Sequence, residues 1–196
     1  VRYGNGVEIY GGCENYVIDH CYVYQIYDAG ITHQLSSGGN EDCIMKHIRY
    51  TNNLIEYCTY SIEYFLGKAS RADAVREMSD IEIRGNILRF AGYGWGNQRP
   101  DKSTPAHFKG WDHYNKTAGS FIIEDNIVEY SRYMLLHCGT GDDKWNPILR
   151  GNTFLQYSDG ELGRFGKAPT KLLAYKYKNV IRIEFLGNEF YVINTD

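Results

Sequence analysis

The chain has 196 residues, of which 43% are hydrophobic, which is enough for one globular domain with a substantial core. Its formal net charge of −3 argues against the strongly basic surface of a nucleic-acid-binding protein. No apolar run reaches the length of about 18 residues that a membrane-spanning helix needs, and no signal peptide is visible at the N-terminus.

One phrase recurs along the chain: an alternating apolar run, a polar pair and a second short apolar run. Its copies occupy residues 16–26, 47–58, 80–91, 121–131, 147–158 and 181–192. The second residue of the polar pair is Cys21 in the first copy and an asparagine in the others: Asn53, Asn86, Asn126, Asn152 and Asn188. The steps between these positions are 32, 33, 40, 26 and 36 residues. Self-similarity at a variable spacing predicts a solenoid, in which each repeat buries its apolar face against the next.

The period inside each repeat is that of a β-strand. Ile81 and Ile83 alternate with Glu82 and Arg84, which gives one apolar and one polar face. A third short run follows, at residues 29–34, 60–65, 92–96, 133–138 and 160–165. Three short strands per repeat predict an all-β fold, a parallel β-helix solenoid of about six coils. The strong bias of parallel connections favours a right-handed coil.

The recurring asparagine has two predicted tasks. A tight turn between two strands demands a backbone conformation that asparagine tolerates better than most residues. In coils stacked about 4.8 Å apart, each side-chain amide can also bond the next one. We therefore expect a buried ladder of asparagine side chains, and the alternative is a set of independent surface turns.

The asparagine column and the Gly-Ile step in residues 28–34 (DAGITHQ) resemble the right-handed parallel β-helix, or pectin-lyase-like, superfamily, over about residues 7–193. That superfamily includes polysaccharide lyases, glycoside hydrolases, pectin esterases, epimerases, phage tailspikes and adhesins. The resemblance implies a carbohydrate-active protein that is secreted or lies at the cell surface, with a polysaccharide or another glycan as its partner. The calcium-binding carboxylates and the arginine motif of pectate lyases are not visible in this sequence.

Neither end of the repeat array shows a capping element in the sequence. No amphipathic helix precedes residues 7–12, and residues 189–196 end on a strand pattern. An uncapped β-helix would expose strand edges and an open core. We therefore expect residues 1–196 to form a single domain within a longer protein, with the remaining coils or caps as partners.

The cysteines and tyrosines predict structural roles. The five cysteines form no CxxC or other metal-binding spacing: Cys13, Cys21, Cys43, Cys58 and Cys138. We expect free thiols that act as small apolar groups, and a disulfide between Cys13 and Cys43 is the alternative. Many of the 18 tyrosines recur once per coil, which predicts stacked rings along the solenoid.

The connections after the third strands are the predicted location of function, because long loops on a rigid scaffold carry most binding sites. They leave from the same strand type and should form a wall beside one sheet. The longest, residues 97–120, carries His107, Lys109, Trp111 and Asp112. Trp faces stack on sugar rings, and His, Lys and Asp bond sugar hydroxyls. The alternative is that the aromatic residues only anchor the loop.

The third strands predict the floor of a groove beside this wall. In equivalent places they carry His33, Glu63, Trp95, His137 and Arg164. Glu63 should face away from the inward Ile62. The alternatives are a solvated glutamate at position 63 and buried structural histidines at positions 33 and 137.

A calcium ion is the one cofactor for which the sequence offers candidate ligands. Asp142 and Asp143 are adjacent in a Gly-rich turn and are candidate oxygen ligands for Ca²⁺, and the alternative is a solvated loop tip. No other cofactor is expected.

Two reaction types and one binding function remain open at this level. A glycoside hydrolase needs two carboxyl groups beside the scissile bond, which Glu63 would provide together with Asp112 or Asp142. A lyase needs a cation and a base, for which Arg164, Lys109, His107 and His137 are candidates. The catalytic candidates are Glu63, Asp112, His137 and His107, and the substrate-binding candidates are His33, Trp95, Lys109, Trp111 and Arg164. The hydrolase is slightly favoured, and a non-catalytic glycan-binding or adhesion rod is the alternative.

Overall fold

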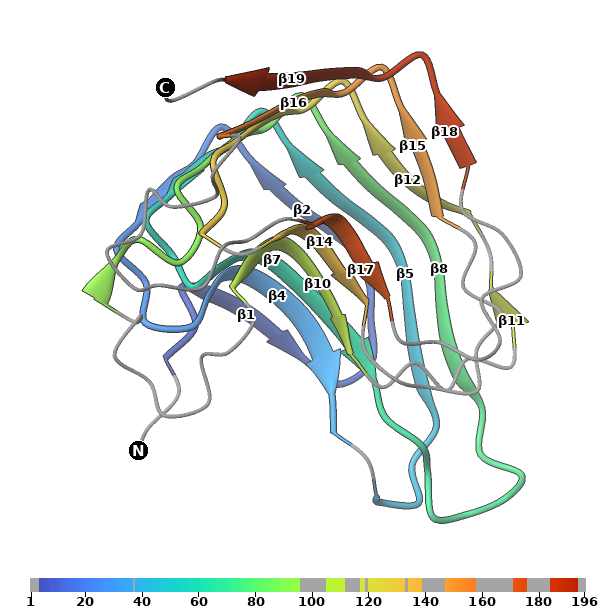
Figure 1. The fold of residues 1–196 in the computed structure, drawn as a ribbon. Coiled ribbons are helices and arrows are strands. Elements are labelled where there is room, and N and C mark those ends of the chain that lie inside the picture. Colours follow the sequence, from blue (N-terminus) through green and yellow to red (C-terminus); the bar gives the residue numbers. More distant parts are fainter. Residues whose placement is uncertain are drawn as a thin grey trace.

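The computed structural model is an all-β solenoid in which the chain passes through three parallel sheets in turn, once per coil (Figure 1). It describes residues 4–36, 38–95, 105–111, 117–118, 120–132, 134–138, 147–157, 171–175 and 184–193. Each sheet contains one strand from each of six successive coils. The predicted parallel β-helix is therefore confirmed. Within the described ranges, no helix has the length and apolar character needed to cross a membrane.

The three sheets are named A, B and C. Sheet A contains β1 (Val7–Tyr10), β4 (Ala29–Leu35), β7 (Tyr60–Leu66), β10 (Ala106–Trp111), β14 (Met134–Cys138) and β17 (Lys171–Tyr175). Sheet B contains β2 (Cys13–Asp19), β5 (Cys43–Thr51), β8 (Arg76–Arg84), β12 (Phe121–Glu124), β15 (Pro147–Arg150) and β18 (Glu184–Leu186), and β11 (Thr117–Ala118) also pairs with β8. Sheet C contains β3 (Tyr22–Tyr24), β6 (Leu54–Glu56), β9 (Ile87–Arg89), β13 (Ile127–Glu129), β16 (Thr153–Tyr157) and β19 (Glu189–Ile193).

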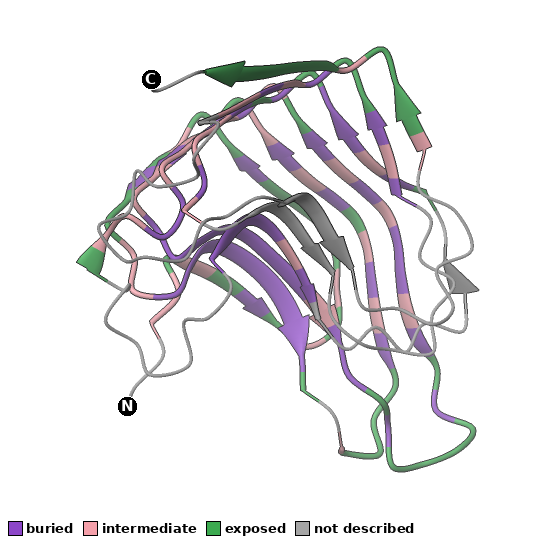
Figure 2. Ribbon diagram, viewed as in Figure 1, coloured by how far each residue is buried: buried purple, intermediate pink, exposed green. Residues whose placement is uncertain are grey.

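Stacked apolar columns fill the interior of the solenoid. Ile31, Ile62 and Phe108 lie opposite one another on neighbouring strands of sheet A, and Ile81 lies opposite Phe121 in sheet B. All five belong to one continuous core. The alternation of buried and less buried residues along the strands of sheet B is visible in Figure 2. Each coil therefore contributes the same faces to a core that runs along the rod.

The predicted asparagine ladder is present. Nδ2 of Asn53 donates a hydrogen bond to Oδ1 of Asn86, and the same bond links Asn86 to Asn126, Asn126 to Asn152 and Asn152 to Asn188, each at 2.9 Å. The first four side chains are at most 1% exposed. The amides thus satisfy one another in the interior, where a lone amide would be costly to bury.

The residue before each ladder position, and not the asparagine itself, makes the tight turn. Positive φ angles of 53° to 65° occur at His20, Asn52, Gly85, Asp125, Gly151 and Gly187. The prediction that the ladder asparagine adopts the unusual backbone conformation is therefore wrong. The turn at the preceding residue leaves the backbone N–H of the ladder residue free to bond the next Oδ1, and the N–H of Cys21 does so with Asn53 at 2.9 Å.

A second column of left-handed residues directly follows the first four strands of sheet C, β3, β6, β9 and β13. It comprises Gln25, Tyr57, Phe90 and Tyr130, with φ between 53° and 58°. The ring of Phe90 lies between those of Tyr57 and Tyr130, with centroids 4.9 and 5.7 Å away, so the predicted stacking of rings along the solenoid is confirmed. A left-handed conformation costs a bulky residue roughly 1–2 kcal/mol, which the stacking partly offsets.

The described cysteines are free thiols, as predicted: Cys13, Cys21, Cys43 and Cys58. The alternative disulfide between Cys13 and Cys43 is wrong. Cys13 lies opposite Met45, two residues beyond Cys43, which puts the two cysteine Cα atoms about 8 Å apart and beyond disulfide reach. Burial raises the pKa of the Cys58 thiol to about 12. The side chain of Cys138 lies outside the description.

Two third strands lie later in the chain than predicted. The strand of sheet A that follows β9 is β10, which lies within the segment expected to be a loop, whereas residues 91–95 form a turn. The strand of sheet A that follows β16 is β17, and the run at 160–165 lies outside the described residues. The link from sheet C to sheet A is long in both coils, and spacing alone did not reveal this. His107, Lys109 and Trp111 therefore belong to the sheet and not to a loop above it.

Candidate functional site

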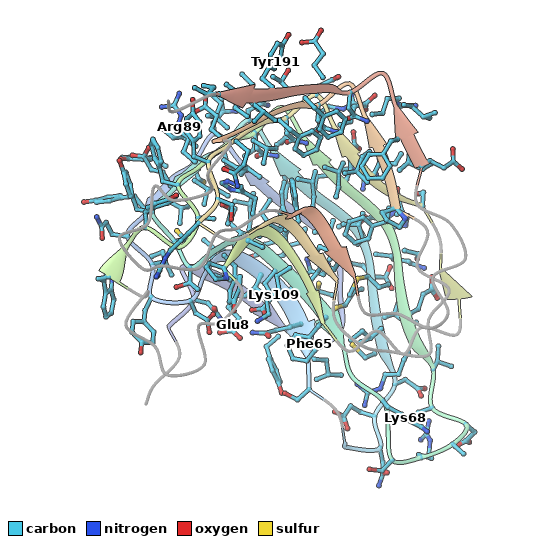
Figure 3. All side chains as sticks on the ribbon, in the orientation of Figure 1. Glu8, Phe65, Lys68, Arg89, Lys109 and Tyr191 are labelled. Carbon is cyan, nitrogen blue, oxygen red and sulfur yellow. The ribbon has the colours of Figure 1, made fainter. Side chains whose placement is uncertain are left out.

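A row of polar residues crosses the outer face of sheet A. Glu8, Thr32, Glu63 and Lys109 lie opposite one another on β1, β4, β7 and β10. Ile62 belongs to the core, so the next residue, Glu63, points outward, as predicted. Figure 3 shows Glu8 and Lys109 on the same side of the sheet. We call these four residues the polar row.

The centre of the polar row is an ion pair with little exposure to water. Nζ of Lys109 lies 2.5 Å from Oε1 of Glu63, and the two side chains are 14% and 7% exposed. The ammonium group also lies 4.0 Å from the centroid of the Tyr60 ring. Burial acts to lower the pKa of Lys109, but the negative charge of Glu63, supported by Tyr60 and Asp28, raises it above its usual value. Lys109 therefore stays protonated at neutral pH.

Two buried polar residues beside this pair were missed by the sequence analysis. Asp28 directly precedes β4 and is 6% exposed, and its backbone oxygen accepts hydrogen bonds from the N–H groups of Thr59 and Tyr60. Thr32 is fully buried, and its Oγ1 has no hydrogen-bond partner among the described residues. The sequence feature that could have indicated Asp28 is the presence of an acidic residue just before the Gly-Ile step of the third strand. The polar row and the neighbouring Asp28 thus combine a charged pair, two further carboxylates and a hydroxyl with unused bonding capacity.

A second row runs beside the polar row, two residues further along each strand. It contains Tyr10, Gln34, Phe65 and Trp111, which lie opposite one another in sheet A. Nε2 of Gln34 donates a hydrogen bond to Glu8 at 2.5 Å and so links the two rows. We call this set the aromatic row.

Exposure changes along the two rows. Tyr10 is 59% exposed and Glu8 is also exposed, whereas Thr32 and Glu63 on the next strands are buried. Strands β4 and β7 are accordingly almost entirely buried in Figure 2, although the strand pattern turns alternate residues outward. Solvent therefore reaches the rows at their β1 end, and the ion pair lies in an enclosed environment.

The two described candidate histidines lie among buried partners. His33 points inward, and its Nδ1 lies 2.8 Å from the hydroxyl of Tyr50, so its predicted place on the outer floor is wrong. Nδ1 of His107 lies 2.9 Å from Oγ of Ser61, and its Nε2 lies 2.9 Å from the backbone oxygen of Glu129. A neutral ring protonated on Nε2 satisfies both contacts of His107. Burial lowers the pKa of each histidine to about 3.

These two histidines make a testable prediction about pH. Their pKa values are about 3 in the folded state, whereas an imidazole in the unfolded chain has its ordinary pKa of 6.5, so the unfolded state binds more protons between these limits. The unfolding free energy should therefore fall as the pH drops from 6.5 towards 4, by up to about 2.7 kcal/mol per pH unit for both rings. Urea unfolding at several pH values measures this slope. His33→Gln should reduce the slope by about half, and an unchanged slope would contradict the assignment.

Trp95 lies at the corner between sheets C and A, not on a third strand as predicted. Its Nε1 donates a hydrogen bond to the backbone oxygen of Gln25 at 2.5 Å, and its ring centroid lies 4.6 Å from that of Tyr27. It is nevertheless 54% exposed. Trp95 therefore does not belong to the predicted floor of the groove, and it lies against the first coil instead.

The remaining candidates are described in part or not at all. The backbone of His137 lies opposite Lys109 in sheet A, which extends the polar row by one position. The side chains of His137 and Trp111 lie outside the description, as do the whole residues Asp112, Asp142, Asp143 and Arg164. Among the described residues, no group of three or more His, Cys, Asp or Glu side chains is placed to hold a metal ion. The calcium site at residues 142–143 therefore stays a prediction.

Comparisons of the chain with protein-family models, with curated proteins and with solved structures found no match. The architecture and the outer face of sheet A are consequently the basis for a functional proposal.

Proposed function

We propose that this β-solenoid is a carbohydrate-active protein of the pectin-lyase-like type, most simply a secreted or cell-surface glycoside hydrolase, that binds a polysaccharide along the outer face of sheet A. The observation that carries the proposal is the pairing of the polar row with the aromatic row on one face. Aromatic rings stack on the apolar faces of sugar rings, while carboxylates and hydroxyls bond sugar hydroxyls. A site repeated from coil to coil suits an extended polymer.

The protonation of Lys109 favours a hydrolase over a lyase. A lysine base must release its proton, whereas the neighbouring charges raise the pKa of Lys109. Glu63 faces the ammonium group at 2.5 Å and fits the role of nucleophile or base. The second carboxyl group of a hydrolase is then Asp28, the other described carboxylate that acts on Lys109, or one of the undescribed candidates Asp112 and Asp142.

Screening neutral and uronic-acid polysaccharides for new reducing ends and for unsaturated products tests this proposal. A hydrolase generates reducing ends without unsaturated products. On a substrate that the parent cleaves, Glu63→Gln should lower turnover by about 10²–10⁴-fold while the protein stays folded. Glu14→Gln, which changes an exposed carboxylate of sheet B instead, is the matched control. Full activity of Glu63→Gln would show that Glu63 is not catalytic.

A non-catalytic glycan-binding or adhesion rod is the second candidate. It is favoured by the close engagement of Glu63 with Lys109, since a paired carboxylate can position a ligand without reacting. Binding of a polysaccharide without cleavage by the parent protein would select this function. Formation of unsaturated products would instead select a lyase.

A further inference from the structure

The corner between sheets C and A in the first coil carries aromatic residues from β3, from the segment that follows β3 and from the segment that follows β9. Tyr22, Tyr24 and Trp95 are exposed and Tyr27 is partly buried, and we call these four residues the aromatic corner. We propose that the aromatic corner is a second sugar-binding surface, on which rings of the same polysaccharide stack outside the enclosed polar row. This inference rests on the proposed carbohydrate function and adds a subsite to it.

Trp95 is held so that its ring, and not its N–H group, is available to a ligand. The indole N–H is already bonded to the oxygen of Gln25 at 2.5 Å. The ring contacts Tyr27 with a centroid distance of 4.6 Å and an interplanar angle of 47°, yet Trp95 remains 54% exposed as a residue. A fixed ring with a satisfied donor and an open apolar surface is a stacking platform that loses little conformational entropy on binding.

The backbone next to Trp95 explains how the ring is fixed. A Cβ atom added to Gly94 would lie 1.9 Å from the backbone oxygen of Tyr57. Only glycine permits this approach, so the chain after β9 packs directly against the second coil and reaches back to the first. The position of Trp95 thus follows from main-chain contacts with coils far from it in sequence.

Tyr22 and Tyr24 extend the surface along β3. The two residues are 58% and 55% exposed, and their rings stack on each other with centroids 5.0 Å apart and an angle of 14°. The hydroxyl of Tyr22 donates a hydrogen bond to Glu56 at 2.6 Å, which fixes that ring. These side chains combine an apolar face with a polar edge, as a sugar ring does.

The aromatic corner is continuous with the proposed site. Tyr27 precedes Asp28 in the chain, and the hydroxyl of Thr59 donates a hydrogen bond to the backbone oxygen of Tyr27 at 2.8 Å. The backbone N–H of Thr59 bonds the oxygen of Asp28, so one pair of segments supports both surfaces. A polymer bound at the polar row therefore has sugar units available for the corner. This continuity with the proposed glycan site favours a glycan over a protein partner.

Affinity electrophoresis in gels that contain xylan, polygalacturonate, alginate or mixed-linkage β-glucan tests the inference. On a polysaccharide that retards the parent, Trp95→Ala should weaken binding by about tenfold, with an unchanged melting temperature. Tyr191→Ala is the matched control, because Tyr191 is 52% exposed on β19 at the other end of the solenoid (Figure 3). That control should bind as the parent does.

Three outcomes would overturn the inference in distinguishable ways. Equal retardation of the parent and Trp95→Ala would remove the corner from glycan binding and leave the proposed function intact. A parent that none of the four polysaccharides retards would count against the proposed function and, with it, the corner. A change from dimer to monomer in Trp95→Ala, seen by size-exclusion chromatography without a change in retardation, would make the corner a contact between copies of the chain.

Discussion

Replacing Asn126 with leucine should lower the unfolding free energy by about 3–6 kcal/mol, because it leaves several buried polar groups without partners. Oδ1 of Asn126 accepts hydrogen bonds from the backbone and side-chain nitrogens of Asn86, both at 2.9 Å. Its Nδ2 donates to the backbone oxygen of Ile83 and to Oδ1 of Asn152, also at 2.9 Å. Leucine has a similar size but replaces none of these bonds. Thermal unfolding should show a fall of roughly 10 °C or more.

Two further variants separate the ladder from general effects of mutation. Asn126→Asp keeps the acceptor but loses both donors and brings a charge into the interior, so it should be comparably destabilising. Asn52→Gly removes an exposed asparagine next to the ladder while preserving the left-handed backbone, and it should change stability little. A melting temperature unchanged by Asn126→Leu would show that the ladder does not stabilise the solenoid.

The features that repeat in every coil could be predicted from the sequence. The corner between sheets B and C is short and nearly constant, so the polar pair marks it in each repeat and the ladder follows from stacking. The ring stack at Tyr57, Phe90 and Tyr130 follows in the same way, since β6, β9 and β13 each end three residues after the ladder position. The spacing within one repeat determines the places of the ladder residues and of the stacked rings, because no long connection separates the two.

The outer face of sheet A could be predicted only in part. The connection into this sheet varies in length, so residues 92–96 were taken for a strand that lies at β10 instead. Strand parity was a second obstacle, because a shift of one residue moves a side chain to the opposite face. Glu63 was assigned to the correct face, whereas His33 was not. The partnership of Glu63 with Lys109 joins residues 46 positions apart and depends on the register of β7 with β10, which periodicity does not reveal.

The second large effect is expected at that partnership. Lys109→Met should destabilise the protein by about 3–5 kcal/mol, because it leaves the Glu63 carboxylate, 7% exposed, without its counter-ion. Glu63→Gln should cost less. It leaves the ammonium group with the Tyr60 ring at 4.0 Å and with the negative charge of Asp28. The double variant should recover much of the loss, since it removes both charges from the enclosed face.

Denaturant unfolding of the two single variants and the double variant measures the coupling of the pair directly. The matched control is Lys46→Met, because Lys46 and Glu14 are 3.9 Å apart on sheet B and their side chains are 33% and 47% exposed. An exposed pair of this kind contributes about 0–1 kcal/mol, so Lys46→Met should change the unfolding free energy very little. If Lys109→Met were as mild as Lys46→Met, the carboxylate of Glu63 would not depend on Lys109. The enclosed ion pair would then lose its place at the centre of the proposed site, whichever reaction the protein performs.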